Sequence, residues 1–154
     1  MDENKLWKVA FSKKKSDKAI IKAFMNASIS KELISTLTRY LNDIKYPLAI
    51  RSSSLLEDSQ YQPLAGMYST FMLPNSNKSK KTRLEELIKA IKAVYASTYY
   101  KEPKSLIEGS VHHHEEEKMA VIIMELIGKQ HQNRYYPSAD RKSTRLNSSH
   151  SEIS

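Results

Sequence analysis

The stretch from Tyr46 to Asn75 constrains the fold of this chain more than any other part of the sequence. It begins with a short apolar run, Pro47 to Ile50, which is typical of a buried strand that starts with proline. The sequence then turns polar, passes through a turn-rich loop, and ends in a second strand-like run at Tyr68 to Leu73. Polar residues at the end of a buried strand are where sheets of α/β proteins tend to place a ligand.

The polar residues after the first strand, Arg51-Ser52-Ser53-Ser54, favour the binding of a phosphate group. Arginine supplies a planar fork of donors, and the hydroxyls and backbone N–H groups add more. Gly66 lies in a nearby turn, where the missing side chain lets the backbone approach a ligand. A structural ion pair of Arg51 with Glu57 or Asp58 is the alternative, and the residue types alone do not separate the two.

The composition excludes several kinds of site. The 154 residues include only three glycines, so the sequence contains neither of the two common glycine-rich phosphate-binding loops. There is no cysteine, which excludes disulfides, thiol catalysis and cysteine-bound zinc and is compatible with a cytoplasmic location. The sequence has no apolar run of about 18 residues and no secretory signal, so we expect no contact with a membrane.

The formal net charge is +8, with basic residues concentrated at Lys13 to Lys15, Lys78 to Lys104 and after Asp140. Such charge can attract a polyanion. A solvated surface is the favoured interpretation, because exposure is the usual state of lysine and arginine. No aromatic residues are interleaved with the basic ones, so we do not expect nucleic acid as a partner.

Apolar residues at helical spacing predict two helices before Tyr46. The first starts at Ser16-Asp17 and the second at Ser30, which is a typical capping residue. Their apolar stripes are expected to form core: Ile20, Ile21, Phe24 and Met25 in the first helix, and Leu33, Ile34, Leu37, Leu41 and Ile44 in the second.

The second half of the chain predicts a long helix and a strand. Thr82 with Glu85 forms a capping box, and the helical pattern stops before Pro103. The near-continuous apolar run from Lys118 to Ile127 predicts a buried strand, because its length and β-branched content favour a strand over a helix. His112-His113-His114 suggests a metal site, but consecutive residues do not converge on one ion, so a solvated loop is favoured.

The order of these motifs resembles the nucleotide-binding domain of the phosphoenolpyruvate synthase and pyruvate, phosphate dikinase family. That signature is an apolar strand, Arg-Ser-Ser, Glu-Asp, a loop, Ala-Gly, a strand containing Thr and a later strand. The matching residues are Leu48-Ala49-Ile50, Arg51-Ser52-Ser53, Glu57-Asp58, Ala65-Gly66, Thr70 and Met119 to Ile127.

The resemblance implies an α+β fold that is part of an ATP-grasp-like nucleotide-binding domain, incomplete, with a mixed sheet and packed helices. It also implies ATP as the ligand, with Mg²⁺ in the intact family enzyme. Arg51 matches the arginine that binds the ATP phosphates. Gly66, Met67 and Thr70 match the segment that closes over these phosphates. Backbone groups near Glu125, Leu126 and Ile127 match the strand end that borders the adenine.

This sequence departs from the family pattern at several points. Met124 stands where the family usually has glutamine, and the lysine-bearing, glycine-rich segment near the family's N-terminus has no match. Nothing here matches the later family strands that bring residues for the metal and the γ-phosphate, or the domains that hold the pyruvate-type acceptor. We therefore expect a fragment of an ATP-dependent phosphotransferase that is inactive alone. The alternative is a non-catalytic nucleotide-binding or regulatory module.

The expected organisation has three parts. Residues 1–15 form an N-terminal segment with a possible strand around Leu6 to Phe11. Residues 16–139 form the partial ATP-binding domain. Residues 140–154 are polar and aperiodic, which predicts a disordered tail that is not native to the enzyme.

Overall fold

The structure is a computed structural model that describes residues 6–12, 14–54, 68–101, 119–131 and 134–137. The helices in these ranges are α1 (Trp7–Ala10), α2 (Asp17–Asn26), α3 (Lys31–Asp43) and α4 (Lys80–Ser97). The strands are β1 (Leu48–Ser54), β2 (Phe71–Leu73), β3 (Met119–Glu125), β4 (Gly128–His131) and β5 (Arg134–Pro137). The chain divides into two compact units, Met1–Met124 and Glu125–Ser154. The expected α+β class is confirmed.

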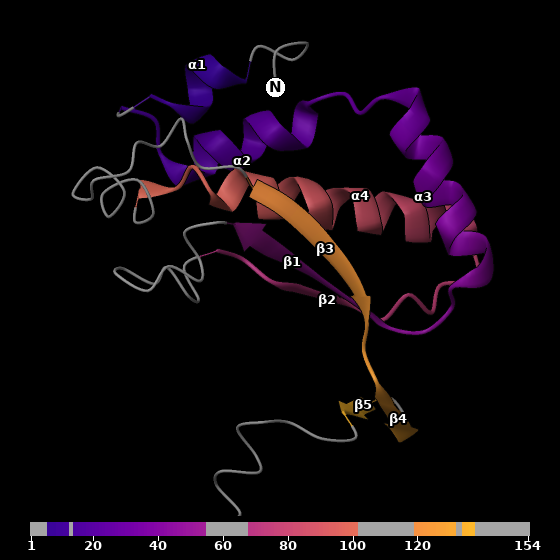
Figure 1. The fold of residues 1–154 in the computed structure, drawn as a ribbon. Coiled ribbons are helices and arrows are strands. Elements are labelled where there is room, and N and C mark those ends of the chain that lie inside the picture. The colour runs from indigo at the N-terminus through magenta and orange to yellow at the C-terminus, as the bar shows by residue number, and fades with distance from the viewer. Residues whose placement is uncertain (1–5, 13, 55–67, 102–118, 132–133, 138–154) are drawn as a thin grey trace, which may run out of the picture. The chain divides into compact units, whose positions relative to one another are not determined.

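The first unit contains a three-stranded sheet with the order β2-β1-β3. β1 and β2 are antiparallel, with Ile50 paired to Phe71 and Leu48 paired to Leu73. The ribbons of β1 and β3 also run in opposite directions, and α4 lies along one face of the sheet (Figure 1). Leu48 and Ile50 point toward this helix and are fully buried in one core with its apolar residues, Leu87, Ala90, Ile91 and Val94.

Helix α4 begins one turn earlier than the sequence predicts. Ser79 is its N-cap and accepts a hydrogen bond from the backbone N–H of Thr82 at 3.3 Å. The predicted capping box of Thr82 and Glu85 is therefore wrong, because both residues lie inside the helix. The buried apolar residues of α4, Leu87, Ala90, Ile91 and Val94, form one stripe along the helix. Each fully buried Leu or Val side chain in such a stripe stabilises the fold by about 1.5–3 kcal/mol.

A second core lies between α1, α2 and the end of α4. It contains Leu6, Ala10, Ile20, Phe24 and Ala96, all of them buried. The possible strand at residues 6–11 is wrong, since this segment forms α1. Helical geometry explains the difference, because it brings Leu6 and Ala10, four residues apart, to one face that packs in this core.

The predicted starts of α2 and α3 are confirmed. The Ser16 hydroxyl accepts a hydrogen bond from the N–H of Ala19 at 3.3 Å. The Ser30 hydroxyl accepts one from the N–H of Leu33 at 3.2 Å. In α3, Leu37 and Leu41 are buried, whereas Leu33 is 40% exposed. The predicted apolar stripe therefore reaches the core only in the later turns of the helix.

Asn75, which follows β2, and Arg83 of α4 both hold the end of α3. Asn75, predicted to begin a solvated linker, is buried and has a left-handed backbone with φ of 51°. Its side-chain amide donates to the carbonyl of Ile44 at 3.2 Å and to that of Tyr46 at 3.0 Å. The buried Arg83 guanidinium donates to the carbonyls of Ile44 at 2.9 Å and Leu41 at 3.1 Å. These bonds satisfy carbonyls at the end of α3 that the helix itself leaves without partners.

The strand predicted in the apolar run is confirmed as β3, but it is only partly buried. Val121 and Ile123 pack against the sheet core. Ile122 and Met124 point the other way and are 40% and 44% exposed. In the second unit, β4 and β5 form an antiparallel hairpin in which Gly128 pairs with Pro137.

Candidate functional site: the open sheet face

The sheet has one face that is free of the described helices. In Figure 1, α1 to α4 all lie on the same side of β1, β2 and β3. Side chains alternate between the two faces of a strand, so the neighbours of the buried Leu48 and Ile50 point away from α4. Met72 is paired with Ala49 and is 61% exposed. We call this surface the open sheet face; it carries Ala49, Arg51, Met72, Ile122 and Met124.

Arg51 lies within β1, because this strand continues to Ser54 and does not end at Ile50 as the sequence predicts. The Arg51 side chain is exposed, and its Nε donates to the carbonyl of Ser52 at 3.3 Å. Ser52 is only 1% exposed and points toward α4. The predicted cluster of hydroxyls is therefore divided, and the Ser52 hydroxyl does not share the face of Arg51.

Thr70 directly precedes Phe71, the first residue of β2, which pairs with Ile50 of β1. The register pairs Ala49 with Met72 and Ile50 with Phe71, so the next step of the same register sets Thr70 opposite Arg51. Both side chains are exposed. Thr70 precedes β2, so it lies just outside the strand that the sequence predicts to include it. Continued by one residue beyond its last recorded pair, this register places two of the residues predicted to contact phosphate near each other.

Several predicted residues lie outside the described part of the chain. They include Gly66 and Met67 of the predicted phosphate-closing segment. Glu57 and Asp58 also lie there, so the predicted alternative of an ion pair with Arg51 is not decided. The same holds for the metal hypothesis at His112 to His114, and for the predicted tail at 140–154.

The residues predicted to border adenine lie in the second unit. Glu125 ends β3 and is exposed. The carbonyl of Leu126 accepts a hydrogen bond from the Tyr135 hydroxyl of β5 at 2.6 Å. Ile127 is 74% exposed, and Gly128 then begins β4. The hairpin therefore fixes the backbone at Leu126 while leaving the side chain of Ile127 in contact with solvent.

Sequence reasoning missed the apolar part of the open sheet face. Met72 and Ile122 were assigned to strands, but their outward direction was not predicted. The alternation of exposure along β3 is visible only once Val121 and Ile123 are known to face the core. A signal did exist in β2, because Met72 is flanked by two larger apolar residues that take the inner face, Phe71 and Leu73.

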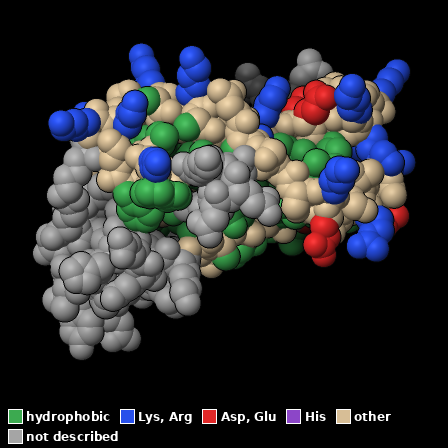
Figure 2. Space-filling view, turned by 90° about the horizontal axis from the view of Figure 1, so that it is seen from above, with side chains coloured by type: hydrophobic (Ala, Val, Ile, Leu, Met, Phe, Trp, Pro, Cys, Tyr) green, Lys and Arg blue, Asp and Glu red, His purple; other side chains and the backbone are tan. Residues whose placement is uncertain are grey.

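The charges of the described residues do not form a single stripe. Lys and Arg side chains are spread over the helical side of the molecule, with apolar side chains between them (Figure 2). The described ranges contain no group of three histidine or acidic side chains that could hold a metal ion. None of the helices in these ranges is long and apolar enough to cross a membrane.

The sequence model of one family, described as the AMP/ATP-binding domain of pyruvate phosphate dikinase, matches residues 4–140. The chain belongs to this family. No curated protein matches the sequence. The match confirms the family and the nucleotide-binding domain that the motifs around Arg51 indicate.

The open sheet face of this AMP/ATP-binding domain suits an adenine nucleotide chemically. A nucleotide needs fixed donors for its phosphates and apolar surface for its base. Arg51 offers a guanidinium, Thr70 offers a hydroxyl, and Met72 offers exposed apolar surface close to both. The residues at this face therefore fit the ligand named in the family description.

Proposed function

We propose that this domain binds ATP with the phosphates on the open sheet face, held by Arg51 and Thr70. The observation that carries the proposal is the register of β1 and β2, whose next step sets these two exposed residues opposite each other. A guanidinium forms two parallel hydrogen bonds to phosphate oxygens, and a hydroxyl adds a third donor.

The remaining contacts come from the resemblance. By this resemblance, we propose that Gly66 and Met67 belong to the segment that closes over the phosphates. Backbone groups of Glu125, Leu126 and Ile127 border the adenine. The Leu126 carbonyl already accepts one hydrogen bond from Tyr135. A carbonyl oxygen has two lone pairs, so this one can still accept a bond from the adenine amino group.

In the intact enzyme we propose that the domain acts as the ATP-grasp part of a cytoplasmic kinase, which passes a phosphoryl group toward a pyruvate-type acceptor held by other domains. Phosphoryl transfer depends on positioning and on neutralising the phosphate charge with Mg²⁺ and basic groups. The residues assigned to the phosphates supply one cation, Arg51, and no carboxylate for Mg²⁺. The chain alone is therefore expected to bind ATP weakly and not to transfer phosphate.

Isothermal titration calorimetry with ATP, with and without Mg²⁺, tests the assignment. Arg51→Ala removes a charged hydrogen bond and is expected to weaken ATP binding by about 10- to 100-fold. Arg51→Lys keeps the charge but loses the fork, so it should bind with intermediate affinity. Arg39→Ala is the matched control, because Arg39 is an exposed arginine of α3 on the helical side.

Equal ATP affinity in wild type and Arg51→Ala would show that Arg51 does not bind phosphate. Strong binding of ATP with no phosphoryl transfer, even when acceptor-binding domains of a family enzyme are added as separate proteins, would favour the regulatory module. Formation of phosphoenolpyruvate by the purified chain would contradict the expected inactivity.

A further inference from the structure

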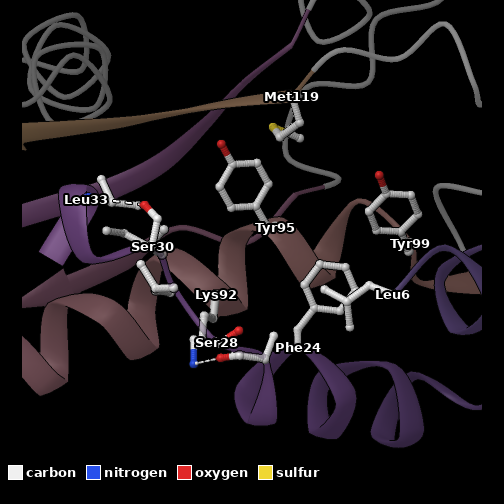
Figure 3. A pocket seen from close by; sticks show the side chains of 12 residues that line it. Leu6, Phe24, Ser28, Ser30, Leu33, Lys92, Tyr95, Tyr99 and Met119 are labelled. Atoms are coloured by element: carbon white, nitrogen blue, oxygen red, sulfur yellow. Dashed lines mark hydrogen bonds between the residues drawn. The ribbon is translucent and has the colours of Figure 1, made fainter. Parts of the chain in front are cut away.

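A pocket of about 480 Å³ lies on the helical side of the sheet, away from the open sheet face. It is formed by the end of α2, the turn into α3, the second half of α4 and the first residue of β3. Its walls are mainly apolar and aromatic. Figure 3 shows Tyr95 and Tyr99 projecting on the same side as Met119, with Lys92 and Phe24 below them.

Lys92 brings a positive charge to this pocket. Its Nζ donates to the carbonyl of Met25 at 2.9 Å and to that of Ala27 at 2.6 Å. These carbonyls lie at the end of α2, where a cation is favourable. An ammonium group has three N–H donors, so one remains. Lys92 forms no ion pair with a carboxylate in the described part of the chain.

The residues that line the pocket indicate the chemistry of the rest of the ligand. Phe24 and Tyr99 stack with ring centroids 5.7 Å apart, which fixes one side of the pocket. Tyr95 is 37% exposed and Met119 is half-buried, so their apolar surface is available inside the opening. Aromatic rings and a thioether sulfur both make favourable contacts with another aromatic ring. The volume is in the usual range of small-molecule sites, about 300–1,000 Å³.

We propose that this helix-side pocket binds a small organic monoanion with an aromatic body, its anionic group at Lys92 and its ring against Tyr95 and Met119. A carboxylate accepts the remaining N–H of Lys92, and the ring covers apolar surface that water otherwise contacts. The site is separate from the proposed ATP site, because its residues lie on the other side of the sheet from Arg51.

Methionine methyl NMR tests the proposal, because methionines mark both sides of the sheet. Met119 lines the pocket, whereas Met72 and Met124 lie on the open sheet face. The probe is 3-phenylpropionate, added at millimolar concentration to the whole chain labelled at its methionine methyl groups. The Met119 signal is expected to shift in a saturable way, while the Met72 and Met124 signals stay unchanged. The neutral analogue 3-phenylpropanol should bind at least about tenfold more weakly, since it lacks the charge.

Variants separate the charge from the packing. Lys92→Met should reduce the affinity for 3-phenylpropionate about tenfold or more, down to that for the alcohol. Lys89→Met is the matched control, since Lys89 is an exposed lysine of the same helix. If Lys92→Met loses its helical circular dichroism, Leu33→Glu replaces it. That change puts a negative charge on an exposed lining residue and should also weaken binding of the anion.

Three results would overturn the proposal. One is no Met119 shift, and another is a shift of Met72 and Met124 in its place. The third is equal affinity for the anion and the alcohol. A titration with ATP distinguishes the two proposed sites. ATP should shift the methyl signal of Met72 and leave the methyl signal of Met119 unchanged. Failure of the ATP site therefore leaves the Met119 result interpretable.

Discussion

The hydroxyl of Ser97 accepts a hydrogen bond from the backbone N–H of Ser69 at 3.0 Å. Ser97 is fully buried at the last residue of α4, and it also donates to the carbonyl of Val94 at 2.7 Å. Ser69 directly precedes Thr70, which the register sets opposite Arg51. The end of α4 thus fixes the backbone of one predicted phosphate residue through a single side chain.

Replacing Ser97 by alanine should therefore affect both stability and ligand binding. The Ser69 N–H would lose its partner, which is expected to lower the free energy of unfolding by about 1–3 kcal/mol. ATP affinity should fall as well, because Thr70 would no longer be held in place. Urea denaturation and calorimetry measure the two effects. Ser76→Ala is the control, since Ser76 is an exposed residue beyond β2. Unchanged stability and affinity would show that the Ser97 bond does not position this segment.

Asn75 allows its backbone and side-chain roles to be measured separately. Asn75→Gly loses the side-chain bonds to Ile44 and Tyr46 but tolerates the positive φ. Asn75→Ala loses the same bonds and also strains the backbone by about 1–2 kcal/mol. The alanine variant should therefore unfold at lower denaturant concentration than the glycine variant, and both below wild type. The reverse order of the two variants would contradict the left-handed conformation.

Much of the scaffold could be predicted because it depends on local patterns. The caps at Ser16 and Ser30 are short-range signals, and the structure has both. The strand from Met119 to Glu125 follows from a dense run of β-branched residues. The family could be inferred from the order of motifs around Arg51, and the family match confirms it.

The parts that sequence reasoning missed depend on contacts between distant segments. Asn75 was taken for a linker residue because its partners, Ile44 and Tyr46, lie about thirty residues earlier. Ser52 was taken for a phosphate donor because residue type does not show that β1 continues and turns this side chain into the core. In both cases a polar residue is buried, and burial of polar groups is decided by tertiary partners and not by local pattern.

The pH dependence of stability should carry a contribution from Tyr100. Burial of its side chain raises the pKa of the Tyr100 phenol above its ordinary value of 10.0. The negative charge of Asp17 is a second, smaller cause of this rise in pKa. The folded state thus favours the protonated phenol, so its stabilising contribution is complete below pH 10.0 and is lost as the pH rises through the raised pKa.

Tyr100→Phe removes this titration, so the stability of the variant should fall less steeply than that of wild type above pH 10.0. Denaturant unfolding at a series of alkaline pH values measures the difference between the two curves. Asp17→Asn removes only the second cause and should give an intermediate slope. Parallel curves for wild type and Tyr100→Phe would show that the phenol has the same pKa in both states.

Gly128 leaves no room for a side chain in the hairpin of the second unit. A Cβ atom there would meet the backbone carbonyl oxygen of Tyr136 and would lie 2.7 Å from a ring carbon of Tyr135. The backbone of β5 cannot move away without losing the pairing of β4 with β5. Gly128→Ala is therefore expected to destabilise the hairpin by about 1–3 kcal/mol, as other overpacked sites do.

Amide hydrogen exchange can localise this effect, because the hairpin and α4 belong to different compact units. In Gly128→Ala the amides of Lys129 and Tyr136 should exchange faster, while those in the middle of α4 keep their rates. Lys129→Ala is the matched control, since this exposed side chain can be shortened without a clash. Faster exchange in α4 as well would show that the two units unfold together, and unchanged exchange in the hairpin would mean that β5 accommodates the methyl group.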